Sequence, residues 1–168
     1  MKFEIISGTV FIENLNSFLK ILNEISIKHN VKIQGMDANK IAGETHIQFA
    51  IDKACLSMKM GKNIAKDMGI EIMRYASGKR QIMDAFSIGL YEGKNDVIFI
   101  IFGNEINKIT NTIDEIKTII YEKPLLDYTY SKKNKIMEQF NITDCEIKAV
   151  GIEKIALLVI ERVALADL

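Results

Sequence analysis

The chain has 168 residues, of which 48% are hydrophobic and 26% are charged, a composition typical of a folded globular protein of about one domain rather than of a disordered chain. Lys and Arg number 22, as do Asp and Glu, so the balanced charge excludes a general nucleic-acid binder and restricts any polyanion contact to a local patch. Two cysteines, Cys55 and Cys145, exclude a disulfide scaffold and predict reduced, buried thiols. The opening reads as a strand and no apolar run has the length of a membrane span, so we expect a cytoplasmic protein.

Two strands and a helix are predicted at the start of the chain. Residues 2–10 alternate or run apolar, and residues 31–36 do so over a shorter stretch, so both segments favour strands. Between them, apolar residues recur at the helical period from Leu15 to Ile25, and Asn14 precedes this helix as its candidate N-cap. Residues 37–40 are then expected to form a connector.

A second helix is predicted after this connector. Thr45 and Gln48 have the spacing of a capping box, and an apolar stripe of helical period follows over residues 47–58. His46 then lies in the first turn, and Lys53 returns to nearly the same side of the helix two turns later.

The stretch 69–86, GIEIMRYASGKRQIMDAF, combines three kinds of signal. The apolar residues up to Met73 favour a strand, the small residues after it a tight exit, and the remainder a helix for which Ser77 is the candidate N-cap. The first turn of a helix has unpaired N–H groups and partial positive charge, to which Lys79 and Arg80 would add two full charges. The stretch therefore predicts an anion site; the alternative is an ordinary turn glycine beside two solvated cations.

The second half of the chain predicts one strand and several helices. Residues 96–102 form a continuous apolar run with β-branched residues, which favours a strand covered on both faces. Residues 106–120 predict a long amphipathic helix, and shorter helices are expected over 131–140 and 143–150. Residues 153–165 are apolar nearly all round, which is typical of a helix that is deeply buried or shared with a partner. Together these elements predict the fold class α+β: one domain over residues 1–168, with a mixed β-sheet packed with helices.

The usual motifs of enzymes and cofactor sites are absent from the sequence. Residues 77–79 suggest a phosphate loop, but Met73 stands where its first glycine should be and Arg80 replaces the serine or threonine that would hold magnesium. Hydrolase, zinc-protease and kinase motifs are missing too, and nothing in the spacing of His29 and His46 favours a metal site. We therefore expect a protein that is not an enzyme, with no catalytic residues, no metal and no cofactor.

A local excess of basic residues lies between residues 53 and 80, offset in that span only by Asp67 and Glu71. Arginine and lysine bind phosphate, and Arg80, Tyr75 or His46 could stack on an unpaired base. Three alternatives stay open: a solvated face for the lysines, a locally hydrogen-bonded helix-end histidine for His46, and a core strand residue for Tyr75. The basic residues are Lys53, Lys59, Lys62, Lys66, Arg74, Lys79 and Arg80.

Several segments resemble one known family. Residues 71–82, EIMRYASGKRQI, resemble the signature E-[LI]-[LM]-x-Y-A-S-G-x-R-Q-I of the small kinase-binding subunit of the KEOPS complex, the archaeal relative of the human PRPK-binding protein TPRKB. Residues 63–65 resemble its N-I-A, and residues 161–168 its closing E-R-V-A-L-x-[DE]-L. Upstream, its A-D-x-[IV]-[AV]-G-x-x-H-[LI]-x-x-A stretch is similar at Asp37, Ala38, Ala42, Gly43, His46, Ala50 and Ala54. The resemblance covers most of the chain.

This resemblance implies a non-catalytic adaptor subunit of the KEOPS complex, which installs threonylcarbamoyl on an anticodon-loop adenosine of tRNA. The implied roles are to bind and regulate the complex's small atypical kinase and to recruit tRNA through its single-stranded 3′ CCA end, a part in tRNA processing and modification. A single-stranded end offers phosphates and a bare base, so one basic cleft on a neutral protein is sufficient. The residues implied for the tRNA 3′ end are Ser77, Gly78, Lys79, Arg80 and Gln81, with His46, Lys53 and Arg74 beside them.

The kinase-facing surface has no motif of its own. We assign it to the apolar surplus of the last helix and the residues after Gln81, namely Phe86, Leu90, Leu158 and Leu165. A runner-up function is a small-metabolite or nucleotide phosphate-binding protein that uses the Ser77–Arg80 loop. A third is a purely structural adaptor in which this loop is inert.

Overall fold

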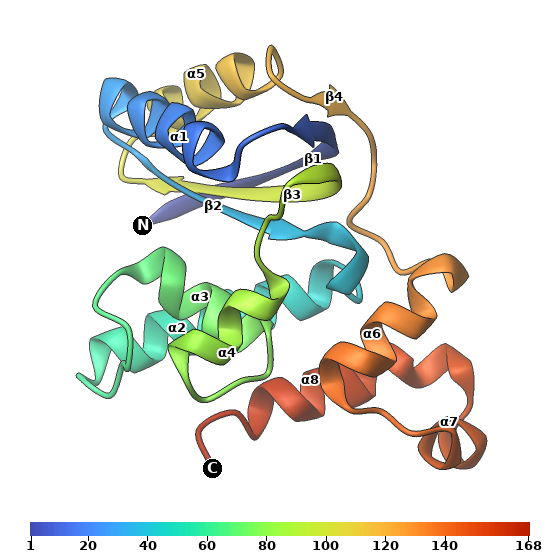
Figure 1. The fold of residues 1–168 in the computed structure, drawn as a ribbon. Helices are drawn as coiled ribbons and strands as arrows, with labels where there is room; N and C mark the ends of the chain where they lie inside the picture. The colour runs from blue at the N-terminus through green and yellow to red at the C-terminus, as the bar shows by residue number, and fades with distance from the viewer. The chain divides into compact units, whose positions relative to one another are not determined.

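The structure, a computed structural model, describes residues 1–168. Contacts divide the chain into two compact units, residues 1–38 with 90–125 and residues 39–89 with 126–168. Short 3₁₀ turns cover Ala38–Lys40, Phe86–Ile88, Tyr130–Lys132 and Ile152–Lys154. The strands and helices are β1 (Lys2–Ile12), α1 (Leu15–His29), β2 (Lys32–Asp37), α2 (Glu44–Lys59), α3 (Met68–Ala76), α4 (Ile82–Ala85), β3 (Gly93–Gly103), α5 (Ile106–Ile116), β4 (Tyr121–Glu122), α6 (Lys133–Phe140), α7 (Asp144–Val150) and α8 (Ile155–Ala164) (Figure 1).

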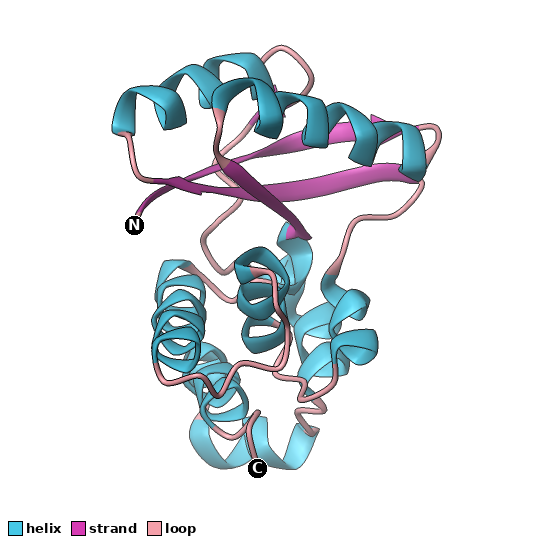
Figure 2. Cartoon of the chain, turned by 90° about the vertical axis from the view of Figure 1, so that its left-hand side faces the viewer, coloured by secondary structure: helices cyan, strands magenta, loops and turns pink.

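The first unit is a four-stranded sheet with two helices on one face. The strand order is β2-β3-β1-β4, and α1 and α5 lie side by side on the same side of the sheet (Figures 1 and 2). Phe18 and Leu22 of α1 and Ile109 of α5 pack there against Phe99 and Ile101 of β3. This apolar layer fixes the position of both helices on the sheet.

The α+β prediction is confirmed, whereas the prediction of a mixed sheet is wrong. Every pair of neighbouring strands is antiparallel. β1 and β2 run in the same direction, as expected for strands joined by a helix, but β3 lies between them and pairs with both. The extent of the domain, residues 1–168, stays a prediction.

Most of the elements predicted for this unit are present. Asn14 caps α1 by accepting a hydrogen bond from the amide of Ser17 at 2.9 Å. All residues from Val97 to Phe102 of β3 are buried, so the prediction of a strand covered on both faces is confirmed. The predicted helix over 106–120 ends earlier, at Ile116, and β4 was not predicted because it pairs over only two residues.

The second unit consists of helices, with α2 packed against α3 and α8 (Figure 2). The predicted apolar stripe of α2 is buried at Ile47, Ala50, Ile51 and Ala54. The predicted capping box is wrong, because α2 begins at Glu44 and Gly43 precedes it without a side-chain cap. None of the helices in the chain combines the length and apolar character needed to cross a lipid bilayer.

The strand predicted before Met73 is wrong, because this segment is the helix α3. Asp67 caps it by accepting hydrogen bonds from the amides of residues 69 and 70, at 2.8 and 3.2 Å. Gly69, Ile72, Met73 and Ala76 are all buried, a spacing of i, i+3, i+4 and i+7 that is helical. The helix predicted after it shortens to α4 and a 3₁₀ turn.

The thiols also differ from the prediction. Cys55 and Cys145 are both free, as expected, but Cys55 is half-buried and Cys145 is exposed near the start of α7. Cys145 lies in the first turn of α7, a helix with no buried residues, so its side chain does not reach the core.

Candidate functional site

The turn after α3, residues Ser77–Gln81, is closed by its own main-chain hydrogen bonds. The amide of Gly78 donates to the carbonyl oxygen of Tyr75 at 2.9 Å, and the amide of Lys79 donates to that of Arg74 at 3.3 Å. This pair of bonds is the Schellman motif of a helix C-terminus, and Gly78 has the positive φ, +65°, that the motif requires. The predicted helix N-terminus is therefore wrong: Ser77 ends α3, and these two amides are already bonded within the turn.

Side chains of α6 hold the Ser77–Gln81 turn from outside. Gln139 donates from Nε2 to the carbonyl oxygen of Ser77 at 3.2 Å. The ring of Phe140 packs against Gly78, where an added Cβ would lie 3.1 Å from the ring atom Cδ1. The position of the turn is thus set by two residues about 60 positions further along the chain.

His46 of α2 binds the end of α3 and is buried. Its Nδ1 accepts a hydrogen bond from the amide of Ala42 at 3.2 Å, and its Nε2 lies 2.9 Å from the carbonyl oxygen of Ala76. A neutral ring with its proton on Nε2 satisfies both contacts. Burial lowers the pKa of His46 to about 4, although the hydrogen bond to Ala76 acts in the opposite direction. Of the two possibilities for His46, the structure therefore supports the locally hydrogen-bonded histidine and not a ring that is free to stack on an RNA base.

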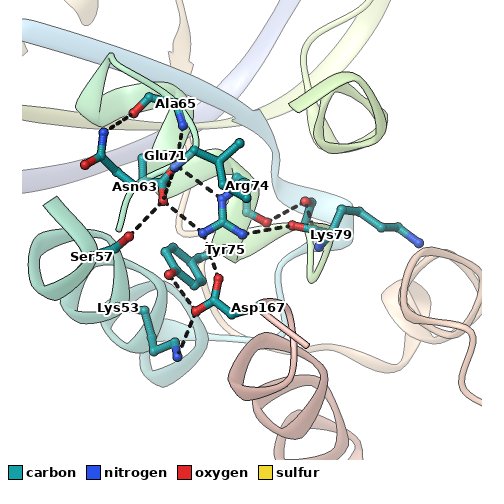
Figure 3. Close-up of polar contacts among 11 residues, drawn as sticks. Lys53, Ser57, Asn63, Ala65, Glu71, Arg74, Tyr75, Lys79 and Asp167 are labelled. Atoms are coloured by element: carbon teal, nitrogen blue, oxygen red, sulfur yellow. Dashed lines mark hydrogen bonds and ion pairs between the residues drawn. The ribbon is translucent and has the colours of Figure 1, made fainter. Parts of the chain in front are cut away.

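Glu71 and Arg74 form a buried ion pair within α3 (Figure 3). Arg74 donates from Nη2 to Oε1 of Glu71 at 2.9 Å and from Nε to Oε2 at 3.2 Å, and both side chains are 0% exposed. Glu71 also accepts hydrogen bonds from Ser57 and from the amide of Ala65, at 3.2 and 2.9 Å. Burial would raise the pKa of Glu71, but the hydrogen bonds from Arg74 and Ala65 outweigh it and hold that pKa below its ordinary value.

Asp167, beyond the end of α8, completes this network. Its Oδ1 accepts from Nη2 of Arg74 at 3.0 Å, and its Oδ2 accepts from the hydroxyl of Tyr75 at 2.8 Å. Lys53 of α2 contributes an ion pair at 3.4 Å to the same carboxylate (Figure 3). Tyr75 is itself buried, beneath the guanidinium of Arg74 at 4.0 Å from its ring centroid. Arg74 and Lys53, predicted beside an RNA end, are thus bound here to an acid of the protein itself, Asp167.

The predicted residues that do face solvent are the last three of the turn. Arg80 and Gln81 are exposed, and Lys79 is half-buried. The side chain of Lys79 points away from the Glu71–Arg74 pair (Figure 3). Neither Lys79 nor Arg80 forms an ion pair with an acid; Arg80 donates from Nη1 to the main-chain oxygen of Leu168 at 3.2 Å. The turn therefore presents two cations that have no salt bridge to an Asp or Glu side chain.

A shallow depression of about 480 Å³ lies beside Lys79. Lys40 enters its lining and donates from Nζ to the carbonyl oxygen of Ser87 at 2.5 Å. Met83 is largely exposed there and offers an apolar surface. The full lining is Lys40, Lys79, Met83, Asp84, Ser87, Glu138 and Gln139. Lys40, Met83 and Gln139 were not predicted, because no motif marks them and only the fold brings them to the turn.

The remaining basic residues of the predicted excess are separate from the turn. Lys59 lies at the end of α2, and Lys62 and Lys66 lie in the following connector; all three are exposed. Their side chains fit the solvated-face alternative, because all three are exposed to solvent. The structure holds no group of three or more His, Cys, Asp or Glu side chains that could bind a metal.

The four residues predicted for the kinase surface differ in exposure. Phe86 and Leu165 are about half exposed, at 51% and 46%, and Leu158 of α8 is half-buried. Leu90 belongs to the first unit, where it packs against the core of the sheet and lies next to Gly35. Leu157 of α8 is more exposed than Leu158 and was missed, because a helix apolar on all sides does not reveal which side is buried.

These features define an α+β protein with a buried Glu71–Arg74 ion pair and a cationic turn at its surface. The chain belongs to the family of the kinase-binding protein CGI-121, whose model matches residues 11–167. This is the family that the sequence resemblance identified, and it makes a kinase the partner class of the chain. A search of curated proteins gave no significant match.

Proposed function

We propose that this chain is the non-catalytic, kinase-binding subunit of the KEOPS complex and that it recruits tRNA by its single-stranded 3′ CCA end. The resemblance of residues 71–82 supports the assignment to KEOPS. The observation that carries the recruiting role is that the Ser77–Gln81 turn is fixed from within, yet its cations Lys79 and Arg80 are not paired with acids. Because its partner is a tRNA under modification, we place the protein in the cytoplasm.

The turn offers the two kinds of contact that a single-stranded RNA end requires. Lys79 and Arg80 are cations held at a defined position, which suits successive phosphates of the backbone. The depression beside Lys79 has about 480 Å³ of space, within the range of sites that bind small ligands. Met83 supplies an apolar surface there for an unstacked base.

The same geometry changes the proposed roles of four residues. Arg74 and His46 act indirectly in this proposal, because both are buried and fix the turn through main-chain oxygens and Glu71. Ser77 and Gly78 shape the turn through the Schellman motif. With Arg74 and Lys53 bound to Asp167, direct contact with RNA is left to Lys79, Arg80 and Gln81.

Binding of two tRNA forms to two proteins tests this proposal. We would measure the dissociation constant of full-length tRNA, and of the same tRNA lacking CCA, for the wild type and for Arg80→Glu. We expect each change alone to weaken binding about tenfold or more, and the CCA deletion to have little further effect on Arg80→Glu because both remove the same contact. Lys148→Glu is the matched control, since Lys148 is an exposed cation of α7 and not part of the turn.

Two results would count against recruitment by the 3′ end. One is equal affinity of the wild type for tRNA with and without CCA. The other is an effect of Arg80→Glu no larger than that of Lys148→Glu, which would reduce the turn to general electrostatic attraction.

A further inference from the structure

The carboxylate of Asp167 occupies an anion-binding site built from two other helices. Arg74 and Tyr75 of α3 and Lys53 of α2 all donate to it, at 3.0, 2.8 and 3.4 Å. A guanidinium, a phenol hydroxyl and an ammonium that converge on one point form a set of donors that also binds a phosphate. The donors are drawn together with Asp167 in Figure 3.

The donors of this site are held by the protein independently of Asp167. Arg74 has two hydrogen bonds to Glu71 that do not involve Asp167, and its guanidinium also lies on the ring of Tyr75. The Asp167 side chain, by contrast, is 43% exposed. The site is therefore preorganised, while its present occupant lies at the surface.

The segment that carries Asp167 is attached loosely compared with the helix before it. Val159 and Val163 anchor α8 with no exposure, but α8 ends at Ala164. Of residues 165–168 only Ala166, the smallest, is buried, while Leu165 and Leu168 are exposed. The segment can therefore leave its place without removing the apolar contacts that hold α8.

The same segment also contacts the Ser77–Gln81 turn. Arg80 donates to the main-chain oxygen of Leu168 at 3.2 Å, so residues 165–168 contact both Arg74 and Arg80. This short segment thus covers the buried cation of Arg74 and restrains the exposed cation of Arg80. Both residues lie in the region to which the proposed function assigns the RNA end.

We propose that residues 165–168 gate the RNA site, with Asp167 in the place that a phosphate of the tRNA 3′ end takes once the segment moves away. This inference rests on the proposed function. In the closed state the segment competes with RNA, so the apparent affinity is reduced by the fraction of molecules that are open. In the open state Lys53 and Arg74 add a phosphate contact to those of Lys79 and Arg80.

Neutralising the competing carboxylate tests the gate. We would titrate full-length tRNA into the wild type, Asp167→Asn and Asp127→Asn. Asp127 is the matched control because it is an exposed acid of the same unit, so its loss changes the net charge equally. We expect Asp167→Asn to bind tRNA about five- to tenfold more tightly than the wild type, and Asp127→Asn to bind nearly as the wild type does. Equal behaviour of the two variants, or weaker binding by Asp167→Asn at unchanged melting temperature, would overturn the gate.

Hydrogen exchange of the wild type gives a second test that needs no variant. The amide of Ala166 donates to the carbonyl oxygen of Val163 in α8 at 3.3 Å, and the amide of Leu168 donates to that of Leu165 at 3.0 Å. We expect bound tRNA to speed their exchange while the amides of α8 stay protected. Slower or unchanged exchange in the complex would contradict displacement of the segment.

The gate and the recruiting role fail in different ways. If the wild type binds tRNA in a CCA-dependent manner but Asp167→Asn matches Asp127→Asn, the gate is wrong and recruitment stands. If none of the proteins binds tRNA in a CCA-dependent manner, recruitment is wrong and the gate fails with it.

Discussion

Arg74 and Glu71 lie one helical turn apart in α3, share two hydrogen bonds of 2.9 and 3.2 Å, and have no solvent-exposed side-chain surface. The same guanidinium lies 3.5 Å, by Nη1, from the carbonyl oxygen of Lys79 in the Ser77–Gln81 turn. The pair therefore connects the buried end of the helix to the part of the turn that reaches solvent.

Removing one partner of this pair leaves the other charge buried. We expect Glu71→Gln to lower the free energy of unfolding by about 3 kcal/mol or more, because Arg74 would lose its counter-charge inside the protein. Urea denaturation at neutral pH measures this. Glu105→Gln is the control, since Glu105 pairs with Lys108 at the surface and such pairs contribute little. Similar losses for both variants would show that the buried pair has no special part in stability.

Two effects disfavour any side chain at position 78, the positive φ and the close contact with Phe140, and they can be measured separately. Gly78→Ala places a Cβ both in a backbone conformation of positive φ and 3.1 Å from Phe140. Gly61 has nearly the same φ, +64°, but no atom within 4 Å of its added Cβ. We expect Gly61→Ala to cost about 1 kcal/mol and Gly78→Ala about 2–3 kcal/mol in thermal or urea unfolding. Equal costs would mean that α6 does not hold the turn through Phe140.

His46 makes the stability depend on pH. Its pKa is about 4 in the folded protein, against an ordinary value of 6.5. Between these values the unfolded chain binds more protons, so stability falls as the pH falls from 6.5 towards 4, by about 3 kcal/mol in all. Urea denaturation from pH 7 to 4 would show this, and His46→Gln should remove most of the slope. A wild-type stability that stays constant over this range would refute the buried neutral ring.

How far the sequence predicts this structure depends on the range of the interactions. α1 and α2 follow from a clear apolar period, with Asn14 marking the start of α1. α3 does not follow from the apolar pattern alone, because Ile70 and Ile72 have the alternating spacing of a strand within a segment that also has the helical spacing. Asp67 as N-cap and Arg74 three residues after Glu71 decide for the helix, and both were present in the sequence.

The candidate site shows the same limit. Lys79 and Arg80 were identified from local charge, and both reach solvent. The contact of Arg74 with Asp167 was not foreseen, because the two residues are 93 positions apart in the sequence. The role of His46 depends likewise on Ala76, 30 residues further on. Contacts of this range come from the packed helices rather than from any local pattern.

The exposed apolar residues at the ends of α4 and α8 give a test of the kinase surface. We expect Phe86→Asp and Leu165→Asp each to weaken binding to the kinase partner more than about tenfold, because a charge at a desolvated contact is unfavourable. Isothermal titration calorimetry would measure the affinities. Ile27→Asp is the control, since Ile27 is exposed on α1 in the other unit. If only Ile27→Asp weakens the complex, the kinase binds elsewhere.

The salt dependence of tRNA binding tests most directly the claim that the Ser77–Gln81 turn holds the RNA backbone. The affinity of full-length tRNA would be measured at several salt concentrations for the wild type and for the double variant Lys79→Gln/Arg80→Gln. Loss of two contacts to single-stranded phosphates should reduce the slope of log K against log salt by about 1.4. Equal slopes for the two proteins would contradict the account.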